Sequence, residues 1–371
     1  MTRLPERIFD VAVVGLGPAG ATLARLLAER GLDVAAVDRK KRAPEEGGFR
    51  KPCGGLLAED AQLSLARQKL ALPKSVLADP QIFSVRTIDF CAEREREYRR
   101  AYVNMDRHRF DLWLKSLVPA NAFVLDDATV RGFSRGARGL FEIRVYAEGE
   151  EKTLTARTLV GADGASSLVR RTLFPAHEIR CCTAVQQWFS DAQERPLYAC
   201  FFDERLTDCY GWAASKDGAL VFGGAFPREN SSRAYELLRQ RATDYGFSLK
   251  NPVRTEACAV LRPERMSDFV LGDGNGAFLV GEAAGLISPS SLEGISYALD
   301  SAEILAGVLA DALPLDAEIF GTLAENYRAR SRGLRLKLLF KTLKNPFLYQ
   351  PALRRFIMAS GLCAIDAFEG A

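Results

Sequence analysis

Side chains that bind metals are scarce and scattered in this sequence of 371 residues. It contains two histidines, His108 and His177, and eight cysteines that form no CxxC pair. Structural zinc sites need clustered cysteine and histidine ligands, so no metal site is expected. The adjacent Cys181 and Cys182 form a disulfide only with strain. We therefore expect free thiols and a cytoplasmic protein.

Long apolar runs and a strong net charge are also missing. No run is long enough to span a bilayer, and the net charge of +3 gives no support for a nucleic-acid partner. The apolar run near the N-terminus continues into a glycine-rich turn and a helical pattern. It is therefore interpreted as a buried first strand and not as an export signal.

Residues 9–40 have the pattern strand, tight turn, helix, strand. Gly15, Gly17 and Gly20 form a GxGxxG motif, in which the glycines permit the turn, a close approach to pyrophosphate and the packing of helix on strand. Asp38 ends the second strand, 18 residues after Gly20, where a carboxylate binds ribose hydroxyls. The segment predicts a dinucleotide site without a 2′-phosphate, and by itself it leaves NAD and FAD open.

Later motifs distinguish the two cofactors. "TLVGADGASSLVRR" and "FLVGEAAGLISPSSLEGISYALDS" each place a strand before a glycine-containing loop and a helix, and "DRHRFDLWL" begins another helix. In this order the motifs resemble the flavoprotein hydroxylase and geranylgeranyl reductase superfamily. "KPCGG", at residues 51–55, resembles a loop of the geranylgeranyl reductases that hydroxylases mostly lack.

The resemblance implies an α/β (overall α+β) fold. It consists of a Rossmann-like FAD-binding domain of the hydroxylase type, an interleaved mixed β-sheet substrate domain and a C-terminal helical segment. We assign residues 1–78, 104–180 and 269–327 to the FAD-binding domain, 79–103 and 181–268 to the substrate domain, and 328–371 to the basic C-terminal segment. FAD is the expected cofactor.

The motifs and the resemblance also indicate which residues contact the flavin nucleotide. The glutamate of "GEAAG" would reach the ribitol, and the following helix N-terminus would face the flavin pyrimidine, where a positive helix end stabilises the anionic N1 of reduced flavin. The expected cofactor-binding residues are Gly15, Gly17, Pro18, Ala19, Gly20, Asp38, Arg39, Lys51, Cys53, Gly54, Gly55, Arg107, Val130, Asp163, Gly164, Gly281, Glu282, Gly294 and Ile295.

The sequence departs from the reductases at two places. Glu282 stands where the reductases usually have aspartate, and "CYGWAASKDG" retains only Tyr210 and Trp212 of their substrate-cavity motif. A WxWxIP segment, which halogenases need, is missing. Cys53, Tyr210 and Trp212 are the candidate catalytic residues. For Cys53 the alternative is a small side chain that only fits beside the flavin, and for Trp212 it is a place in the core of the sheet.

The expected function is that of an FAD-dependent oxidoreductase that transfers hydride from reduced flavin to a C=C bond of an isoprenoid or other apolar or lipid substrate. No second nucleotide fingerprint is found, so an external donor, NAD(P)H or of the ferredoxin type, would reduce the flavin. One alternative is an FAD monooxygenase, in which reduced flavin activates O₂. Another is a flavin-binding protein without enzymatic activity that acts in envelope stress or colicin M tolerance.

The C-terminal segment has a charge of one sign. Residues 328–355 contain nine lysines or arginines and no acidic residue, with leucine and phenylalanine between them. This pattern is typical of a peripheral contact with a membrane surface, here the inner membrane. The alternative is a helix packed on the FAD-binding domain with a solvated basic face.

Overall fold

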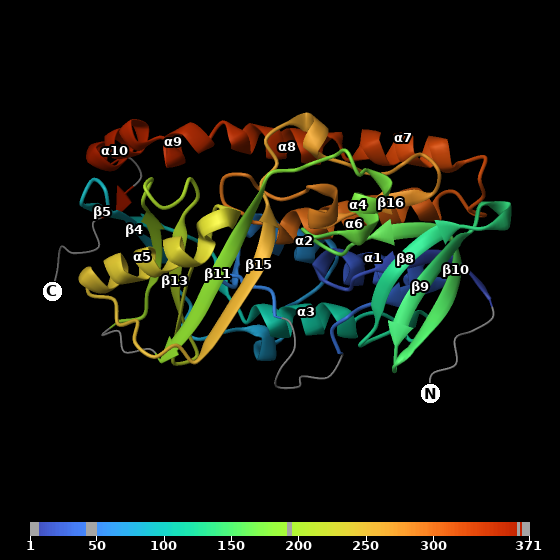
Figure 1. The fold of residues 1–371 in the computed structure, drawn as a ribbon, viewed down its shortest axis with the longest axis horizontal. Coiled ribbons are helices and arrows are strands. Elements are labelled where there is room, and N and C mark those ends of the chain that lie inside the picture. The colour runs from blue at the N-terminus through green and yellow to red at the C-terminus, as the bar shows by residue number, and fades with distance from the viewer. Residues whose placement is uncertain (1–6, 42–49, 191–194, 362–363, 366–371) are drawn as a thin grey trace.

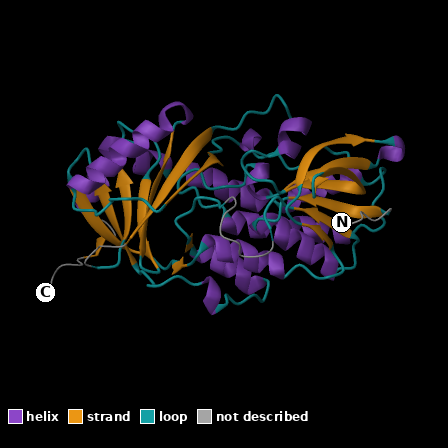
Figure 2. Cartoon of the chain, turned by 60° about the horizontal axis from the view of Figure 1, so that its bottom comes forward, coloured by secondary structure: helices purple, strands orange, loops and turns teal. Residues whose placement is uncertain are grey.

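The computed structural model describes residues 7–41, 50–190, 195–361 and 364–365. Two large β-sheets lie toward opposite ends of the molecule, with helices between them and along one edge (Figures 1 and 2). Cys363, one of the expected free thiols, lies outside the described residues, as do the two ends of the chain. The other seven cysteines are free thiols.

The first sheet contains the nucleotide-binding motifs. Its strand order is β7 (Phe123–Leu125), β2 (Val34–Val37), β1 (Ile8–Val14), β10 (Glu150–Gly161), β9 (Phe141–Ala147) and β8 (Thr129–Arg135), and β16 (Ala277–Leu279) also pairs with β10. Strands β7, β2, β1, β10 and β16 are parallel, whereas β8, β9 and β10 pair antiparallel. Val11 to Val14 are buried between β2 and β10, which explains their unbroken apolar run.

Helices cover this sheet and fix the ends of its strands. α1 (Pro18–Glu29) starts with proline at its first position, where the missing N–H group costs nothing. α6 (Ile295–Ala310) packs on both α1 and α2 (Glu59–Arg67), and α3 (Arg107–Ser116) also contacts α1. α4 (Leu168–Leu173) packs on β10. The apolar faces of these helices and strands form one continuous core.

The second sheet combines two separate parts of the chain. Its order is β15 (Arg254–Leu261), β11 (Cys181–Ser190), β14 (Ala219–Phe226), β13 (Gly211–Lys216), β12 (Tyr198–Phe202), β4 (Ser84–Asp89), β5 (Arg94–Arg99) and β17 (Ala364–Ile365). The parallel pairing of β12 with β4 joins the early hairpin β4–β5 to the later strands. α5 (Ser231–Asp244) covers one face of the sheet, where a phenylalanine-rich core lies.

A short two-stranded sheet connects the two halves. β3 (Leu56–Leu57), directly after "KPCGG", pairs with β6 (Val103–Asn104), directly before α3. The interleaved fold class expected from the sequence is confirmed, whereas the domain boundaries stay a prediction.

The C-terminal segment forms a row of helices along one edge of the molecule (Figure 1). These are α7 (Phe320–Arg330), α8 (Arg332–Thr342), α9 (Asn345–Tyr349) and α10 (Pro351–Ser360). Pro346 and Pro351 lie in the first turns of α9 and α10, where proline starts a helix readily. Gly361, in the left-handed conformation (φ 66°), ends α10.

A methyl group at Gly20 is expected to destabilise the fold. The Cβ of alanine would lie 1.8 Å from the carbonyl oxygen of Gly15, so α1 must move away from the turn that ends β1. Gly20→Ala should lower the free energy of unfolding by about 3 kcal/mol, measured by chemical denaturation. Gly321→Ala, near the start of α7, meets no atom within 4 Å and is the matched control. Equal losses in the two variants would contradict the proposed clash.

Candidate functional site

A single large cavity of about 1300 Å³ is bounded by both sheets and by the C-terminal helices. Its walls include the turn after β1, the ends of β2 and β16, the Cys53 loop, the N-terminus of α6, the inner face of the second sheet, and α9 and α10. Segments from nearly the whole length of the chain therefore meet in one space.

The glycine turn forms one end of the cavity. Gly15 has φ +91°, and a Cβ there would lie 2.8 Å from the carbonyl oxygen of Ala162. A Cβ at Gly17 would meet nothing within 4 Å, so its backbone is open to the cavity. Pro18 and Ala19 also line the cavity, at the N-terminus of α1. The turn thus presents backbone and a positive helix end to a ligand, as a phosphate requires.

Asp38 follows β2 and lies at the cavity wall, largely buried. Its Oδ1 accepts the N–H of Lys40 at 3.2 Å, and its Oδ2 lies 3.2 Å from Nζ of the buried Lys115. Lys115 Nζ also donates to the carbonyl oxygen of Lys40 at 2.6 Å and pairs with Asp126. The carboxylate expected to bind ribose is therefore held in a fixed orientation.

Arg107 is held at the start of α3 by an acidic partner on its own helix. Its Nε donates to Asp111 Oδ1 at 2.8 Å, and Lys40 Nζ donates to Asp111 Oδ2 at 3.0 Å. Burial acts to raise the pKa of Asp111, but these two cations lower it to about 2. Asp111 is thus ionised and holds the Arg107 guanidinium at the cavity wall.

Asp163 and Gly164 lie in the loop after β10, also at the cavity wall. Asp163 Oδ2 accepts the N–H of Leu168, at the start of α4, at 2.7 Å. Its Oδ1 is buried, with no hydrogen-bond partner among the described residues. Burial raises the pKa of this carboxyl group. An oxygen without a partner at this place is suited to a hydroxyl group of a ligand.

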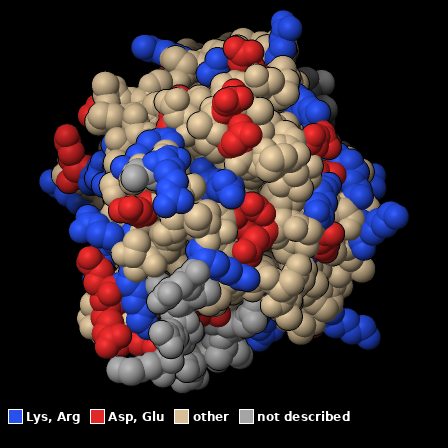
Figure 3. All heavy atoms as spheres, turned by 90° about the vertical axis from the view of Figure 1, so that its right-hand side faces the viewer, with Lys and Arg blue, Asp and Glu red and all other residues tan. Residues whose placement is uncertain are grey.

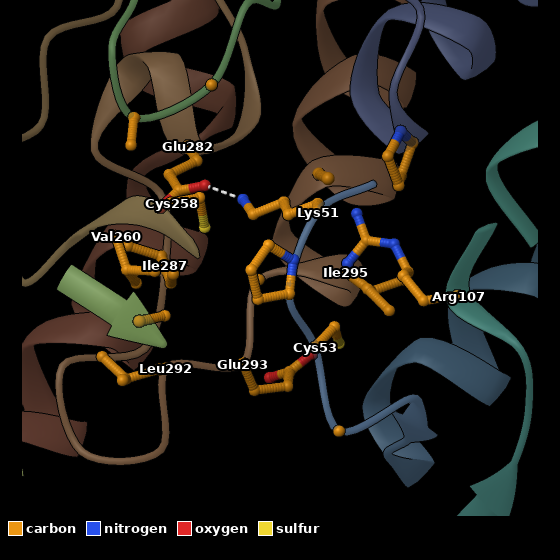
Figure 4. Close-up of a pocket in the computed structure, with 18 of the residues that line it drawn as sticks. Lys51, Cys53, Arg107, Cys258, Val260, Glu282, Ile287, Leu292, Glu293 and Ile295 are labelled. Atoms are coloured by element: carbon orange, nitrogen blue, oxygen red, sulfur yellow. Dashed lines mark hydrogen bonds and ion pairs between the residues drawn. The ribbon is translucent and has the colours of Figure 1, made fainter. Parts of the chain in front are cut away.

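Lys51 and Glu282 form an ion pair across the cavity (Figure 4). The second oxygen of Glu282, Oε1, accepts the N–H of Leu261, the last residue of β15, at 3.0 Å. Burial acts to lower the pKa of Lys51, but the charge of Glu282 raises it above its usual value. Cys258 lies beside the pair, and burial raises the pKa of its thiol to about 11.

The Cys53 loop is fixed from the second sheet by a buried lysine. The Cys53 Sγ accepts the N–H of Gly55 at 3.4 Å. Lys216 Nζ, from the end of β13, donates to the carbonyl oxygens of Gly55 at 3.1 Å and Met105 at 3.0 Å, and to Asn104 Oδ1. Burial lowers the pKa of Lys216 to about 8. Three acceptors therefore satisfy an ammonium group that has almost no access to water.

Tyr210 and Trp212 both line the cavity, and their polar groups are bound to the protein. The Tyr210 hydroxyl donates to the carbonyl oxygen of Ser291 at 2.7 Å, and Trp212 Nε1 donates to Gln186 Oε1 at 3.0 Å. The two rings pack edge to face, with centroids 5.9 Å apart. These contacts make both side chains rigid parts of the wall.

The N-terminus of α6 reaches the cavity through Gly294 and Ile295. The preceding Glu293 accepts from the N–H of Ser296 at 3.1 Å and lies 3.7 Å from Lys341 on α8. A carboxylate thus occupies part of this helix end. It offsets the positive end of the helix that the sequence predicts here.

The structure brings together most residues that the sequence predicts for cofactor binding, although their roles stay predictions. All of them line the cavity except Gly20 and Gly281, which pack against Gly15 and Ala19. Sequence reasoning missed further lining residues on the second sheet and the C-terminal helices. They include Tyr98, Arg100, Tyr102, Tyr198, Cys200, Phe202, Cys258, Tyr349, Ile357 and Met358.

In the described part of the chain, one group of three side chains has the spacing of metal ligands: Asp89, Cys91 and Glu204. Arg354 donates to both carboxylates of this group, to Asp89 Oδ2 and to Glu204 Oε2, each at 2.8 Å. An arginine therefore already neutralises the group.

Lys216→Met is expected to change how stability depends on pH. Because burial lowers the pKa of Lys216 from 10.5 to about 8, the unfolded chain binds more protons between these values. The wild-type protein should therefore gain about 2 kcal/mol of stability relative to Lys216→Met between pH 7 and pH 9.5, measured by chemical denaturation. The exposed Lys250→Met is the control and should follow the wild type. A difference that does not change with pH would contradict the lowered pKa.

Comparisons with known proteins agree with this geometry. A family model described as an FAD binding domain matches residues 9–50. Protein CbrA of Escherichia coli O6:H1 is 50% identical over 361 residues, which cover 97% of this chain and 96% of that protein. No described helix is both long and apolar enough to cross a membrane.

Solved structures share the fold at low sequence identity. A geranylgeranyl bacteriochlorophyll reductase-like protein from Thermoplasma acidophilum has a TM-score of 0.79 at 19% identity, over 95% of this chain and 91% of that one. PqsL, a probable FAD-dependent monooxygenase from Pseudomonas aeruginosa, has a TM-score of 0.68 at 18% identity, over 95% of this chain and 100% of that one. The chain belongs to the CbrA family, within the superfamily of FAD-dependent oxidoreductases and monooxygenases, and FAD is its cofactor.

Proposed function

We propose that this protein is an FAD-dependent reductase that saturates a C=C bond of an isoprenoid or another apolar substrate. The observation that carries the proposal is the extent of the cavity. At about 1300 Å³ it exceeds the roughly 300–1,000 Å³ of a site for one small ligand. Its lining extends past the cofactor motifs to the second sheet and to α9 and α10. We call this part of the cavity the second chamber, where a substrate would have room beside FAD.

The lining of this second chamber suits an apolar molecule. β12 contributes Tyr198, Cys200 and Phe202, and α10 contributes Ile357 and Met358. Most of these side chains present rings, sulfur or alkyl groups to the cavity, and burial raises the pKa of Tyr198 well above its usual value. A chain of isoprene units can bury its surface against such a wall.

The other end of the cavity fits FAD. The backbone at Gly17 is open, as a pyrophosphate needs, and Asp163 Oδ1 is buried without a partner. Asp38 would bind the adenosine ribose, and Glu282 the ribitol. When bound and reduced, FAD supplies hydride. NAD(P)H or a ferredoxin-type protein would be the external donor that reduces it.

Reduction of a C=C bond adds hydride to one carbon and a proton to the other, and the proton needs a donor in the cavity. Cys53 is the best candidate, since its thiol group lies in a loop that lines the cavity. Arg107 and Lys216 lie close enough to interact electrostatically with its sulfur. Tyr210 and Trp212 would shape the cavity, because their polar hydrogens are bound to protein acceptors.

Monooxygenase activity is the second candidate, because PqsL shares the fold over 95% of this chain. A direct assay separates the two reactions. The protein is reduced with dithionite without oxygen and incubated with a long-chain prenyl alcohol or its diphosphate, and products are analysed by mass spectrometry. A reductase gives a product with two added hydrogen atoms per double bond. A product that appears only with O₂ and carries one added oxygen atom would refute the reductase proposal.

Cys53→Ala is expected to retain FAD and to lose turnover. Removal of a proton donor should lower the rate of product formation by about 100-fold or more, whereas the fold of the loop depends on Lys216 and Gly55. Cys91→Ala is the matched control, because Cys91 donates to Asp203 at 3.1 Å and does not line the cavity. FAD content by absorbance and rate by mass spectrometry check the prediction. If Cys53→Ala turns over at the wild-type rate, Cys53 is not the proton donor and only fills space beside the flavin.

A further inference from the structure

The helices α8, α9 and α10 form a ridge, residues 332–360, along one edge of the molecule (Figure 1). On the face shown in Figure 3, at the end of the first sheet, basic and acidic side chains are interspersed. Between residues 328 and 355 the chain has nine basic residues and no acidic one. Acidic side chains from other elements pair with five of the nine: Arg330, Lys337, Lys341, Arg354 and Arg355.

Large apolar side chains are exposed along the ridge. Twelve large hydrophobic residues are exposed in the described part of the chain, and five of them lie between residues 340 and 356. The exposed fraction is 64% for Phe340, 63% for Leu343 and 72% for Phe356. Leu336 and Phe340 lie about one turn apart on α8, Leu343 directly follows α8, and Phe347 lies on the next helix, α9.

Lysines lie beside two of these apolar side chains, Leu336 and Phe340. Lys337, Lys341 and Lys344 line a shallow depression together with Leu336 and Phe340. Asp60 partly neutralises two of them, since it lies 2.8 Å from Lys337 and 3.5 Å from Lys341. Lys337 and Lys344 are exposed. The surface therefore combines apolar rings with ammonium groups, the combination that an anionic lipid interface attracts.

The ridge is also a wall of the main cavity. Lys344, Phe347 and Leu348 from the α8–α9 region, and Ile357 and Met358 from α10, line that cavity. These helices thus expose apolar side chains to solvent and also bound the proposed substrate chamber, and Lys344 and Phe347 are both exposed and in the cavity lining. A surface for lipid here would lie directly beside the chamber.

We propose that the ridge α8–α10 docks on the surface of a bilayer that contains anionic lipid. Phe340, Leu343, Phe347 and Phe356 enter the interfacial region, and the lysines contact headgroup phosphates. The helices lie in the plane of the interface, since no described helix is long and apolar enough to span the bilayer. This inference goes beyond the proposed reductase function and does not depend on it.

Flotation with lipid vesicles tests the proposal. The FAD-loaded protein should float with vesicles of phosphatidylcholine and phosphatidylglycerol, less so at high salt, and poorly with phosphatidylcholine alone. Phe340→Ser/Leu343→Ser and Lys337→Gln/Lys344→Gln should each lower the floated fraction at least 10-fold. The proposal is wrong if the wild type does not float with the anionic vesicles. It is also wrong if both variants float as well as the wild type.

Two controls separate lipid binding from other effects. Phe83→Ser/Val253→Ser removes side chains that are 70% and 71% exposed outside the ridge, and it should float like the wild type. FAD content and circular dichroism of every variant should match the wild type. Light scattering without vesicles gives the molar mass. A dimer that Phe340→Ser/Leu343→Ser converts to monomer would identify the ridge as a contact between two copies and would overturn the proposal.

Discussion

A Cβ atom at Gly20 would lie 1.8 Å from the carbonyl oxygen of Gly15, so the first turn of α1 packs directly on the turn that ends β1. The same turn touches the loop after β10, because a Cβ at Gly15 would lie 2.8 Å from the oxygen of Ala162. Three backbone segments therefore meet without side chains between them. This contact aims the N-terminus of α1 into the cavity and sets Asp38 and Asp163 at its wall. The other walls of the cavity, from the Cys53 loop, the second sheet and the C-terminal helices, complete the space next to this contact.

Two lysines join the halves of the molecule around the cysteine loop. Lys51, two residues before Cys53, pairs with Glu282, while Lys216 reaches from the second sheet to the carbonyl oxygen of Gly55. A buried ammonium group without partners would cost several kcal/mol, and the three acceptors of Lys216 offset this cost. The loop is thereby held from both halves of the molecule at once, which fixes its place in the cavity wall.

Nearly all the residues predicted to bind the cofactor line one cavity, although their roles stay predictions. Their motifs are local: turn, helix start and acid lie within about thirty residues. The substrate chamber has only a weak local pattern. Tyr198, Cys200 and Phe202 alternate along β12 and share the face that lines the cavity. Their spacing of two residues predicts that they share a face of the sheet, but it does not predict whether that face lines a cavity or packs in the core. The partners of Lys216 could not be predicted, since they lie more than 100 residues away along the chain. The place of α9 and α10 in the cavity wall could not be predicted for the same reason, since they are far along the chain from the glycine turn.

The order of the elements along the chain has a consequence for biosynthesis. The glycine turn that forms one end of the cavity is made before α9, α10 and the strand β17, which pairs with β5. During synthesis the cavity therefore lacks one wall until α9 and α10 have emerged from the ribosome. A nascent chain therefore exposes the glycine turn to solvent before that wall is in place.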